Sequence, residues 1–286
     1  MTAILTHRPD QPFDLDRTLD CGQAFRWVKA DGWWQGVVGG RAIRIRQEGD
    51  RLIYSGADEA FIRDYFRLDQ DLPAILASID RDPTIADAIR RCYGLRVVRQ
   101  PPWECLVSYI CATNTNIPAV KRRISLLSER YGSAIGGASW AAHTFPEPER
   151  LAALCHADLR DCRLGYRTDY VSSAAVFAAE HPGWAEQIAA LPYEDARREM
   201  MRLRGVGPKA ADCTLLFAFG FFEAFPVDVW IRRIVAEAYM PELRGRTCTP
   251  AEYDRIRLFA RDYFGEYAGY AQEYLYCARP GPFPCG

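Results

Sequence analysis

The feature that most constrains this fold is a pair of glycines one residue apart, Gly205 and Gly207, between two helical stretches. Tyr193 to Leu203 suits a helix, and Lys209 to Phe219 reads as a mostly apolar helix that follows Pro208, a residue type favoured at the first helical position. Because glycine has no Cβ atom, we expect both glycines to take positive φ and to let another backbone come close. Amides at a helix N-terminus form a natural phosphate site. The sequence therefore predicts a helix–hairpin–helix element over residues 193–220.

A lysine opens the second of these helical stretches. The chain has only three lysines, Lys29, Lys121 and Lys209, against many arginines. Arginine keeps its proton, whereas a lysine that loses its proton is an amine nucleophile. The positive end of the helix dipole disfavours the ammonium form of Lys209. Asp228 follows in Pro-Val-Asp-Val, just before another helical run. We therefore predict that Lys209 and Asp228 are catalytic.

Plain structural roles are the alternative for both residues. In that interpretation Lys209 is a solvated surface lysine and Asp228 is the N-cap of the following helix. The hairpin between them favours the catalytic interpretation, because it places one of the few lysines of an arginine-rich chain at a phosphate-binding position. Capping and catalysis are also compatible in Asp228, since one carboxylate oxygen can serve each role.

Length, composition and charge set broad limits. The chain has 286 residues, 49% of them hydrophobic, which is ample for a core. It contains no apolar run long enough to span a bilayer, and its first residues lack the apolar segment of a signal peptide. We therefore expect a soluble, cytoplasmic protein. The net charge of −1 neither supports nor excludes a nucleic-acid partner, because backbone amides can hold phosphates without any charge.

The ten cysteines are scattered along the chain, and several lie inside apolar helical runs, such as Cys105, Cys111 and Cys213. This placement favours reduced, buried thiols over a disulfide framework. The four histidines are also scattered and give no metal-ligand spacing. No metal site is therefore predicted.

The hydrophobic pattern changes its period along the chain. From Phe13 to about Ser55 short alternating runs are separated by turn residues, as in antiparallel hairpins. Asp58 to Phe66 is predicted as a helix, and the pattern beyond it is almost all helical up to a final helix at Pro250 to Phe264. The predicted fold class is α+β, with a small antiparallel β-sheet N-terminal domain in residues 1–70 and a mostly α-helical body in residues 71–286.

The segment Gly205-Val206-Gly207-Pro208-Lys209, followed by Pro226-Val227-Asp228, resembles the helix–hairpin–helix superfamily of DNA glycosylases, in the branch that carries a catalytic lysine. Further motifs occur in that family's order over about residues 13–277: Gly22-Gln23-Ala24-Phe25-Arg26-Trp27, Glu104-Cys105 through Ile110-Cys111 with Asn114 and Asn116, Leu164-Gly165-Tyr166-Arg167, and Tyr267-Ala268-Gly269-Tyr270-Ala271-Gln272. The ordered set resembles the 8-oxoguanine DNA glycosylase/AP lyase family and not the alkylbase or adenine-removing branches.

This resemblance implies a bifunctional enzyme of base excision repair that flips a damaged base out of duplex DNA. Neutral Lys209 would attack C1′ and displace the base, while Asp228 would stabilise the cationic sugar. The resulting Schiff base would permit β-elimination and a nick 3′ to the lesion. Damaged double-stranded DNA is the expected partner, and the protein is expected to be a monomer.

No cofactor is expected. Some glycosylases of this superfamily carry an iron–sulfur cluster on four closely spaced cysteines near the C-terminus. Here only Cys277 and Cys285 lie there, with Cys248 far upstream, so such a cluster is not supported.

The resemblance also assigns residues to the damaged base. Guanine N7 is an acceptor, and oxidation at C8 turns it into an N–H donor, which the carbonyl oxygen of Gly22 would accept. Gln272 carries both donor and acceptor groups and would read the Watson–Crick edge. Cys213 and Tyr276 would cover the two faces of the flipped ring, with Tyr276 where the family often has phenylalanine. Taken singly, Gly22 has an ordinary alternative as a turn glycine, and Cys213 and Tyr276 have one as core residues.

The resemblance also assigns residues to contacts with the rest of the duplex. Asn114 would occupy the space left by the lesion, Tyr166 would wedge at the opposite strand, and Arg167 would contact the orphaned cytosine. Asn116 and the hairpin glycines Gly205 and Gly207 complete the predicted DNA-binding set.

Three further positions depart from the family pattern. The second arginine that contacts cytosine is replaced by Ala119, which cannot donate a hydrogen bond, so weaker discrimination for cytosine opposite the lesion is predicted. Arg204 stands where proline is usual before the hairpin glycine, and Trp230 stands where some members have a phosphate-contacting histidine. Two other functions stay open at this point: a glycosylase for another oxidised or alkylated base, and a non-catalytic protein that uses the hairpin to hold DNA.

Overall fold

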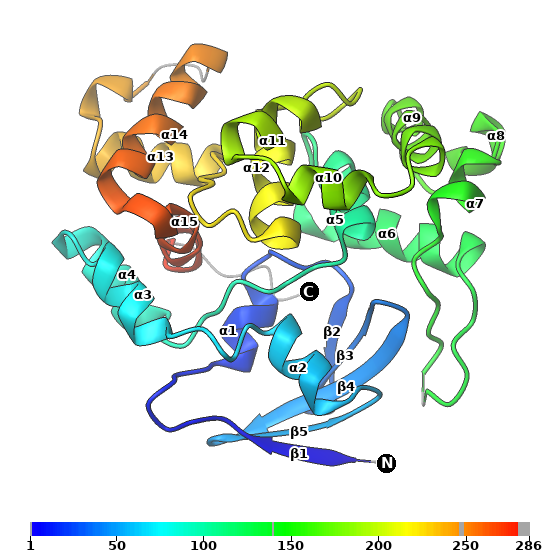
Figure 1. The fold of residues 1–286 in the computed structure, drawn as a ribbon, viewed down its shortest axis with the longest axis horizontal. Helices are drawn as coiled ribbons and strands as arrows, with labels where there is room; N and C mark the ends of the chain where they lie inside the picture. Colours follow the sequence, from blue (N-terminus) through cyan, green and yellow to red (C-terminus); the bar gives the residue numbers. More distant parts are fainter. Residues whose placement is uncertain (1, 139, 246–248, 280–286) are drawn as a thin grey trace.

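A five-stranded antiparallel sheet lies beside a larger helical body in the computed structural model, which describes residues 2–138, 140–245 and 249–279 (Figure 1). The strand order in the sheet is β1-β5-β4-β3-β2. The strands are β1 Ala3–Thr6, β2 Trp27–Ala30, β3 Trp33–Val38, β4 Arg41–Glu48 and β5 Arg51–Ser55. This architecture confirms the predicted α+β class.

Tight turns explain why the sheet forms hairpins. β2 and β3 are joined by Asp31 and Gly32, which have φ of 50° and 75°, and two successive positive φ angles suit the twist of a two-residue hairpin. Along β4 the side chains alternate, so that Ile43 and Ile45 are fully buried between partly exposed neighbours. This period-2 burial gives the sheet one face packed on a core.

Helices make up most of the remaining chain. The helices that precede the hairpin are α1 Leu15–Asp20, α2 Glu59–Tyr65, α3 Leu72–Ile79, α4 Pro83–Arg91, α5 Pro102–Cys111, α6 Ile117–Tyr131, α7 Pro148–Ala152, α8 His156–Arg160, α9 Arg167–Glu180, α10 Trp184–Ala189 and α11 Tyr193–Met200. After the hairpin come α12 Pro208–Thr214, the π-helical η1 Leu215–Phe219, α13 Val229–Ala238, the 3₁₀ turn η2 Pro241–Leu243, α14 Pro250–Phe264, the 3₁₀ turn η3 Gly265–Tyr267 and α15 Ala268–Cys277. No helix among the described residues is long and apolar enough to cross a membrane.

The element predictions need three corrections. The predicted helix at Pro250 to Phe264 is present as α14, but it is not the last one, because α15 follows after a short 3₁₀ turn. The helix predicted from Lys209 to Phe219 changes from α to π hydrogen bonding at Leu215. β1 and α1 were not predicted, since each is only a few residues long.

Two hydrophobic clusters form the core. The smaller one joins the sheet, α1 and α2, and it includes Trp27, whose indole Nε1 donates to the Tyr65 hydroxyl at 2.8 Å. Apart from Val98, its buried members lie between Leu5 and Leu68. The larger cluster fills the helical body. The boundary between the two parts near residue 70 stays a prediction.

A buried polar seam joins the sheet domain to the helical body. The fully buried guanidinium of Arg96 donates to the carbonyl oxygens of Arg67 and Gln70 at 2.7 and 3.1 Å. Gln23, also buried, donates from Nε2 to the carbonyl of Arg96 at 2.9 Å and accepts from the Val98 amide at 2.9 Å. These bonds fix the turn that contains Gly22 against the helical body.

The expectation of reduced thiols is wrong for one pair of cysteines. A disulfide joins Cys92 to Cys277, with a Cα–Cα distance of 6.4 Å. The two residues are far apart in the sequence, and they meet because α15 packs against α4. Cys105, Cys111 and Cys213 are buried and free, as predicted. Cys248 and Cys285 lie outside the described residues.

Candidate active site

A cavity of about 1660 Å³ opens where the turn after α1, the segment between α5 and α6, the hairpin, and helices α13 and α15 meet. Most of the predicted site residues line it, although they come from distant parts of the chain: Gly22, Asn114, Asn116, Gly207, Lys209, Cys213, Asp228, Gln272 and Tyr276. Tyr166, Arg167 and Gly205 do not line this cavity and lie beside it. The fold therefore gathers the residues that sequence motifs singled out.

The two hairpin glycines have different roles. Gly205 has a φ of +85°, and an added Cβ would lie 2.2 Å from Cγ of Tyr170, so this position requires glycine. Gly207 has an ordinary φ of −86° and caps α12. The expectation of positive φ is therefore wrong for Gly207. An added Cβ there meets no atom within 4 Å, so its surface is open to an approaching backbone.

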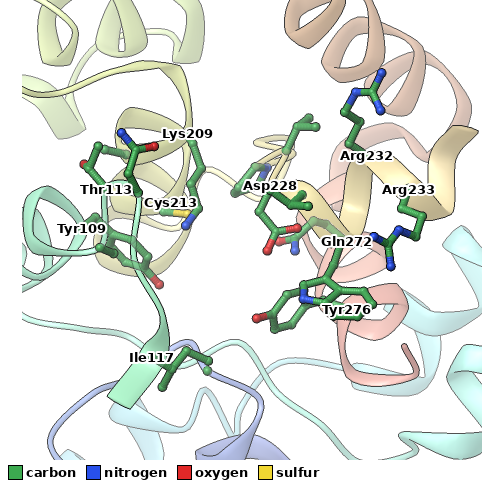
Figure 2. Close-up of a pocket in the computed structure, with 18 of the residues that line it drawn as sticks. Tyr109, Thr113, Ile117, Lys209, Cys213, Asp228, Arg232, Arg233, Gln272 and Tyr276 are labelled. Atoms are coloured by element: carbon green, nitrogen blue, oxygen red, sulfur yellow. The ribbon is translucent and has the colours of Figure 1, made fainter. Parts of the chain in front are cut away.

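Lys209 and Asp228 point into the cavity from facing walls (Figure 2). Lys209 lies in the first turn of α12, directly after Pro208. Asp228 is the N-cap of α13, and its Oδ1 accepts from the Ile231 amide at 2.8 Å. The predicted capping role is thus present, and it holds the carboxylate beside the cavity. An amine and a carboxylate therefore face one open space.

Two uncharged side chains, Cys213 and Tyr276, also line the cavity. Cys213 is buried, and this burial raises the pKa of its thiol, an effect that the positive charge of Lys209 opposes. Burial also raises the pKa of the half-buried Tyr276 phenol. Both groups are neutral near pH 7, so Cys213 and Tyr276 can present apolar surfaces to a flat ligand.

Gly22 closes the cavity on the side of the sheet domain. Its φ is +94°, and an added Cβ would lie 2.8 Å from Cδ1 of Ile117 and 3.6 Å from Cε1 of Tyr276. A larger residue would overlap the Ile117 side chain and would also be strained at this φ. The backbone of this turn is held from behind, because the Gln23 carbonyl accepts from the Gln100 side chain at 2.6 Å and from the Tyr109 hydroxyl at 3.1 Å.

Gln272 presents an unsatisfied acceptor. The residue is 5% exposed, lines the cavity, and its Oε1 has no hydrogen-bond partner. A buried polar atom without a partner costs about 1–3 kcal/mol. Such an orphaned acceptor points to a ligand that donates to it.

A buried network behind the cavity was missed by the sequence analysis. The carboxylate of Asp212 is fully buried and accepts from the hydroxyls of Tyr193 and Tyr253, each at 2.7 Å, and from Nε of Arg197 at 2.9 Å. The Tyr253 hydroxyl also accepts from the Val227 amide at 3.2 Å. The network thereby ties α12 to the residue before Asp228. In the sequence, the only sign of this network is an acidic residue, Asp212, within the apolar run after Lys209.

The predicted DNA-contacting residues lie in two places, Asn114 and Asn116 on the turn between α5 and α6, and Tyr166 and Arg167 at the start of α9. Asn114 is exposed with a φ of +48°, and Asn116 caps α6 by accepting from the Ala119 amide at 3.0 Å. Tyr166 is 52% exposed. Arg167 is buried, and it donates to the backbone carbonyls of this turn. In this structure Arg167 therefore supports the turn, and its contact with a base stays a prediction.

Two positions that depart from the family pattern, Trp230 and Arg204, each take part in a contact with a charged group. The Arg233 guanidinium lies 4.9 Å from the ring centroid of Trp230, and both residues line the cavity. Arg204 lies outside the lining and pairs with Asp169 at 3.4 Å. A cation on an aromatic ring at the cavity edge suits a phosphate ligand.

Comparisons with known proteins agree with this geometry. Residues 6–106 match the family model of the 8-oxoguanine DNA glycosylase N-terminal domain. Residues 107–252 match that of the HhH-GPD superfamily base excision DNA repair proteins. A probable N-glycosylase/DNA lyase of Methanothermobacter thermautotrophicus is 30% identical over 94% of this chain and 94% of its own length.

Solved structures of 8-oxoguanine glycosylases are also similar to this chain. MBOgg1 in complex with a low affinity DNA ligand has a TM-score of 0.87 at 35% identity, covering 96% of this chain and 94% of that one. The Clostridium acetobutylicum 8-oxoguanine glycosylase/lyase, bound to double-stranded DNA with cytosine opposite 8-oxoguanine, has a TM-score of 0.86 at 28% identity. That alignment covers 97% of this chain and 96% of the clostridial one.

Proposed function

This chain belongs to the 8-oxoguanine DNA glycosylases of the HhH-GPD superfamily of base excision DNA repair proteins, and we propose that it excises 8-oxoguanine from duplex DNA and then cleaves the strand. The observation that carries the proposal is the cavity itself, in which an amine, a carboxylate and an unsatisfied buried acceptor meet. They belong to Lys209, Asp228 and Gln272.

The base lies between Cys213 and Tyr276, whose neutral surfaces accept a flat ring. The carbonyl oxygen of Gly22 accepts the N7–H that oxidation creates and repels the N7 lone pair of normal guanine. Gln272 reads the Watson–Crick edge. Because an extruded base must leave its stack, the pocket has to compensate for lost stacking and pairing.

The amine of Lys209 then attacks C1′ of the extruded nucleotide. The C1′–N9 bond breaks, the base leaves with the bonding electrons, and Asp228 stabilises the positive charge that develops on the sugar. Opening of the sugar ring gives a Schiff base between Lys209 and C1′. Loss of a C2′ proton followed by β-elimination expels the 3′ phosphate and nicks the strand.

The surrounding duplex is held by the hairpin and the turn between α5 and α6. The open surface at Gly207 suits close approach of a DNA phosphate to the N-terminus of α12. Asn114 fills the vacated space and Tyr166 wedges at the opposite strand. With Ala119 in place of a second arginine, the base opposite the lesion is read weakly. The protein acts as a monomer on its DNA partner.

Borohydride trapping on a duplex with one 8-oxoguanine tests this function. Wild-type protein is expected to form a covalent adduct, and Lys209→Gln is expected to form none. Release of no base by the wild type would reject 8-oxoguanine as substrate, and a panel of other oxidised and alkylated bases would then be required. Tight binding without chemistry on the whole panel would leave a non-catalytic DNA-binding protein.

A further inference from the structure

An arginine on α6 contacts both segments that carry the predicted DNA-inserting residues. Arg123 lies in the second turn of α6. Its Nη1 donates to the carbonyl oxygen of Cys111 at 3.0 Å and to Oγ1 of Thr115 at 3.1 Å. Its Nε donates to the carbonyl oxygen of Arg163 at 3.1 Å. One guanidinium therefore joins the turn between α5 and α6 to the loop that precedes α9.

Both segments contain backbone that needs support. Asn114 and Arg163 have φ of 48° and 57°, and they are two of the four non-glycine residues with positive φ in the described part of the chain. Such a conformation is unfavourable for a residue with a Cβ atom, and it persists where the surrounding structure holds it. Arg123 bonds to Arg163 itself and to Thr115, the residue after Asn114. It therefore supports the backbone at both places.

The bond to Cys111 fixes the point at which the turn begins. Cys111 is the last residue of α5, so its carbonyl oxygen has no partner within that helix. A positive charge at the C-terminal end of a helix is favourable, because it faces the negative end of the helix dipole. Arg123 therefore stabilises the end of α5, and the turn that contains Asn114 starts from a fixed place.

Arg167 joins the same two segments from the other side. Helices α6 and α9 both pack against α5 (Figure 1). From the start of α9, Arg167 donates to the carbonyl oxygens of Thr113 and Leu164 at 3.1 and 3.3 Å. The Tyr166 hydroxyl also donates to the Thr113 carbonyl at 3.4 Å. Arg123 and Arg167 contact different atoms of the turn, so neither arginine replaces the other.

We propose that Arg123 is a positioning residue, which holds the turn of Asn114 and the loop of Tyr166 at a fixed separation so that both side chains enter the duplex together. This inference rests on the proposed function, in which Asn114 fills the vacated space and Tyr166 wedges at the opposite strand. Extrusion of a base costs the free energy of its pairing and stacking. Side chains that are already in place offset this cost without further ordering. Loss of Arg123 therefore disfavours extrusion, while Lys209 and Asp228 keep their chemistry.

The test compares the release of 8-oxoguanine from two duplexes under single-turnover conditions. In one duplex the lesion is paired with cytosine. In the other it faces an abasic-site analogue, so that no pairing has to be broken and the extruded state is more populated. The variant is Arg123→Gln. Its matched control is Arg122→Gln, which removes the same charge from an exposed neighbour on the same helix.

We expect Arg123→Gln to slow release from the cytosine duplex about tenfold, as for the loss of one hydrogen bond to a charged group. Release from the abasic duplex should slow by about threefold or less, because extrusion there is less costly. A general structural defect would slow both reactions by the same factor. Arg122→Gln should match the wild type on both duplexes.

A second variant tests the same contact at an exposed side chain. Thr115→Val removes the Oγ1 acceptor and keeps the branched shape of the residue. It should slow release from the cytosine duplex by about threefold, as for one weaker hydrogen bond, and it should slow release from the abasic duplex less. Urea unfolding is expected to show a stability close to that of the wild type.

The outcomes separate this inference from the proposed function. A wild-type protein that releases no 8-oxoguanine removes the proposed function. An active wild type for which Arg123→Gln loses the same factor on both duplexes, or loses nothing on either, overturns the role of Arg123 and leaves the function standing. If Arg123→Gln does not fold, Thr115→Val decides the matter, and an unchanged rate or an equal loss on both duplexes overturns the inference.

Discussion

Arg167 donates from Nε to the carbonyl oxygen of Thr113 at 3.1 Å, and its Nη2 reaches the same oxygen. The guanidinium also lies 4.4 Å from the ring centroid of Tyr166. A side chain held by these contacts supports the turn that carries Asn114, whose carbonyl accepts from the same guanidinium at 3.3 Å. The arginine that the sequence assigns to the orphaned base is thus engaged by the protein in this structure.

Replacing Arg167 separates support of the turn from reading of a base. In Arg167→Ala the carbonyls of Thr113 and Asn114 lose their donor, so we expect excision of 8-oxoguanine to slow by roughly tenfold, the effect of about 1.4 kcal/mol. Because the turn serves every duplex, the loss should be similar opposite C, T, G and A in single-turnover assays. A loss confined to cytosine would favour direct base contact. Exposed Arg160 supplies the control, Arg160→Ala.

Restoring an arginine at position 119 should restore discrimination. Ala119 lies in the first turn of α6, next to the cap formed by Asn116. A well-placed bidentate contact contributes about 1–3 kcal/mol of discrimination between bases. In Ala119→Arg we expect the ratio of excision opposite cytosine to excision opposite adenine to rise about tenfold. Ser125→Arg, farther along the same helix, should leave the ratio unchanged, and an equal rise there would point to a general effect of charge.

The hairpin glycines offer a paired test of stability against DNA binding. In Gly205→Ala the new methyl group overlaps the ring of Tyr170 at a φ of +85°, so the free energy of unfolding should fall by about 2 kcal/mol or more. In Gly207→Ala the new methyl group meets no protein atom. Its stability should stay within about 0.5 kcal/mol of the wild type, while its affinity for duplex DNA falls. Urea unfolding and fluorescence anisotropy measure the two quantities, and equal destabilisation by both changes would contradict this assignment.

Removal of the Tyr253 hydroxyl should alter the position of Asp228, because the backbone amide just before it loses a hydrogen bond. In Tyr253→Phe the buried Asp212 carboxylate and the Val227 amide each lose a partner, at a cost of about 1–3 kcal/mol. Because Asp228 follows Val227 directly, we expect kcat to fall while KM for DNA is retained. Tyr263→Phe is the matched control, since Tyr263 lies on the same helix, α14, as Tyr253 and its hydroxyl bonds to Asp82 at 3.1 Å, away from the cavity. A change in KM alone would show that the network does not act through Asp228.

The buried carboxyl group of Glu273 predicts a pH-dependent stability. Its pKa is raised from an ordinary value of 4.5 to about 7 by burial. Between these values the unfolded chain is ionised at this site and the folded chain is protonated, so stability falls as the pH rises. The loss is complete above about pH 7 and amounts to roughly 3 kcal/mol, at about 1.36 kcal/mol per pKa unit. Glu273→Gln should therefore gain stability relative to the wild type at pH 8 compared with pH 5, measured by urea unfolding. Parallel pH curves for the two proteins would refute it.

Local signals predicted two residues of the site from the sequence, whereas the residues that would bind the base followed from the family resemblance. Pro208 after a glycine predicts a helix start that carries Lys209, and an aspartate before an apolar run predicts the cap at Asp228. Both depend on only a few neighbouring residues. The β-rich and helical parts were likewise predicted, because their hydrophobic periods differ.

Long-range packing explains what the sequence could not provide. The bond between Cys92 and Cys277 depends on how α4 and α15 dock. The pairing of Asp212 with Tyr253, and of Glu273 with Cys21, joins residues from different helices in the same way. The engagement of Arg167 by Thr113 depends on how the start of α9 packs beside the turn after α5. Neither the hydrophobic period of the sequence nor a local motif predicts such contacts.

The bonds of Gln23 and Arg96 hold the turn that contains Gly22 against the helical body. Residues that are translated at very different times therefore meet at the pocket. The wall at Gly22 is translated near the beginning of the chain and Gln272 near its end, so the pocket is complete only after α15 docks. The chain up to α13 supplies the amine of Lys209 and the carboxylate of Asp228, and α15 adds Gln272 and Tyr276. The pocket for the base is therefore assembled from distant parts of the chain, and it needs α15 to be complete.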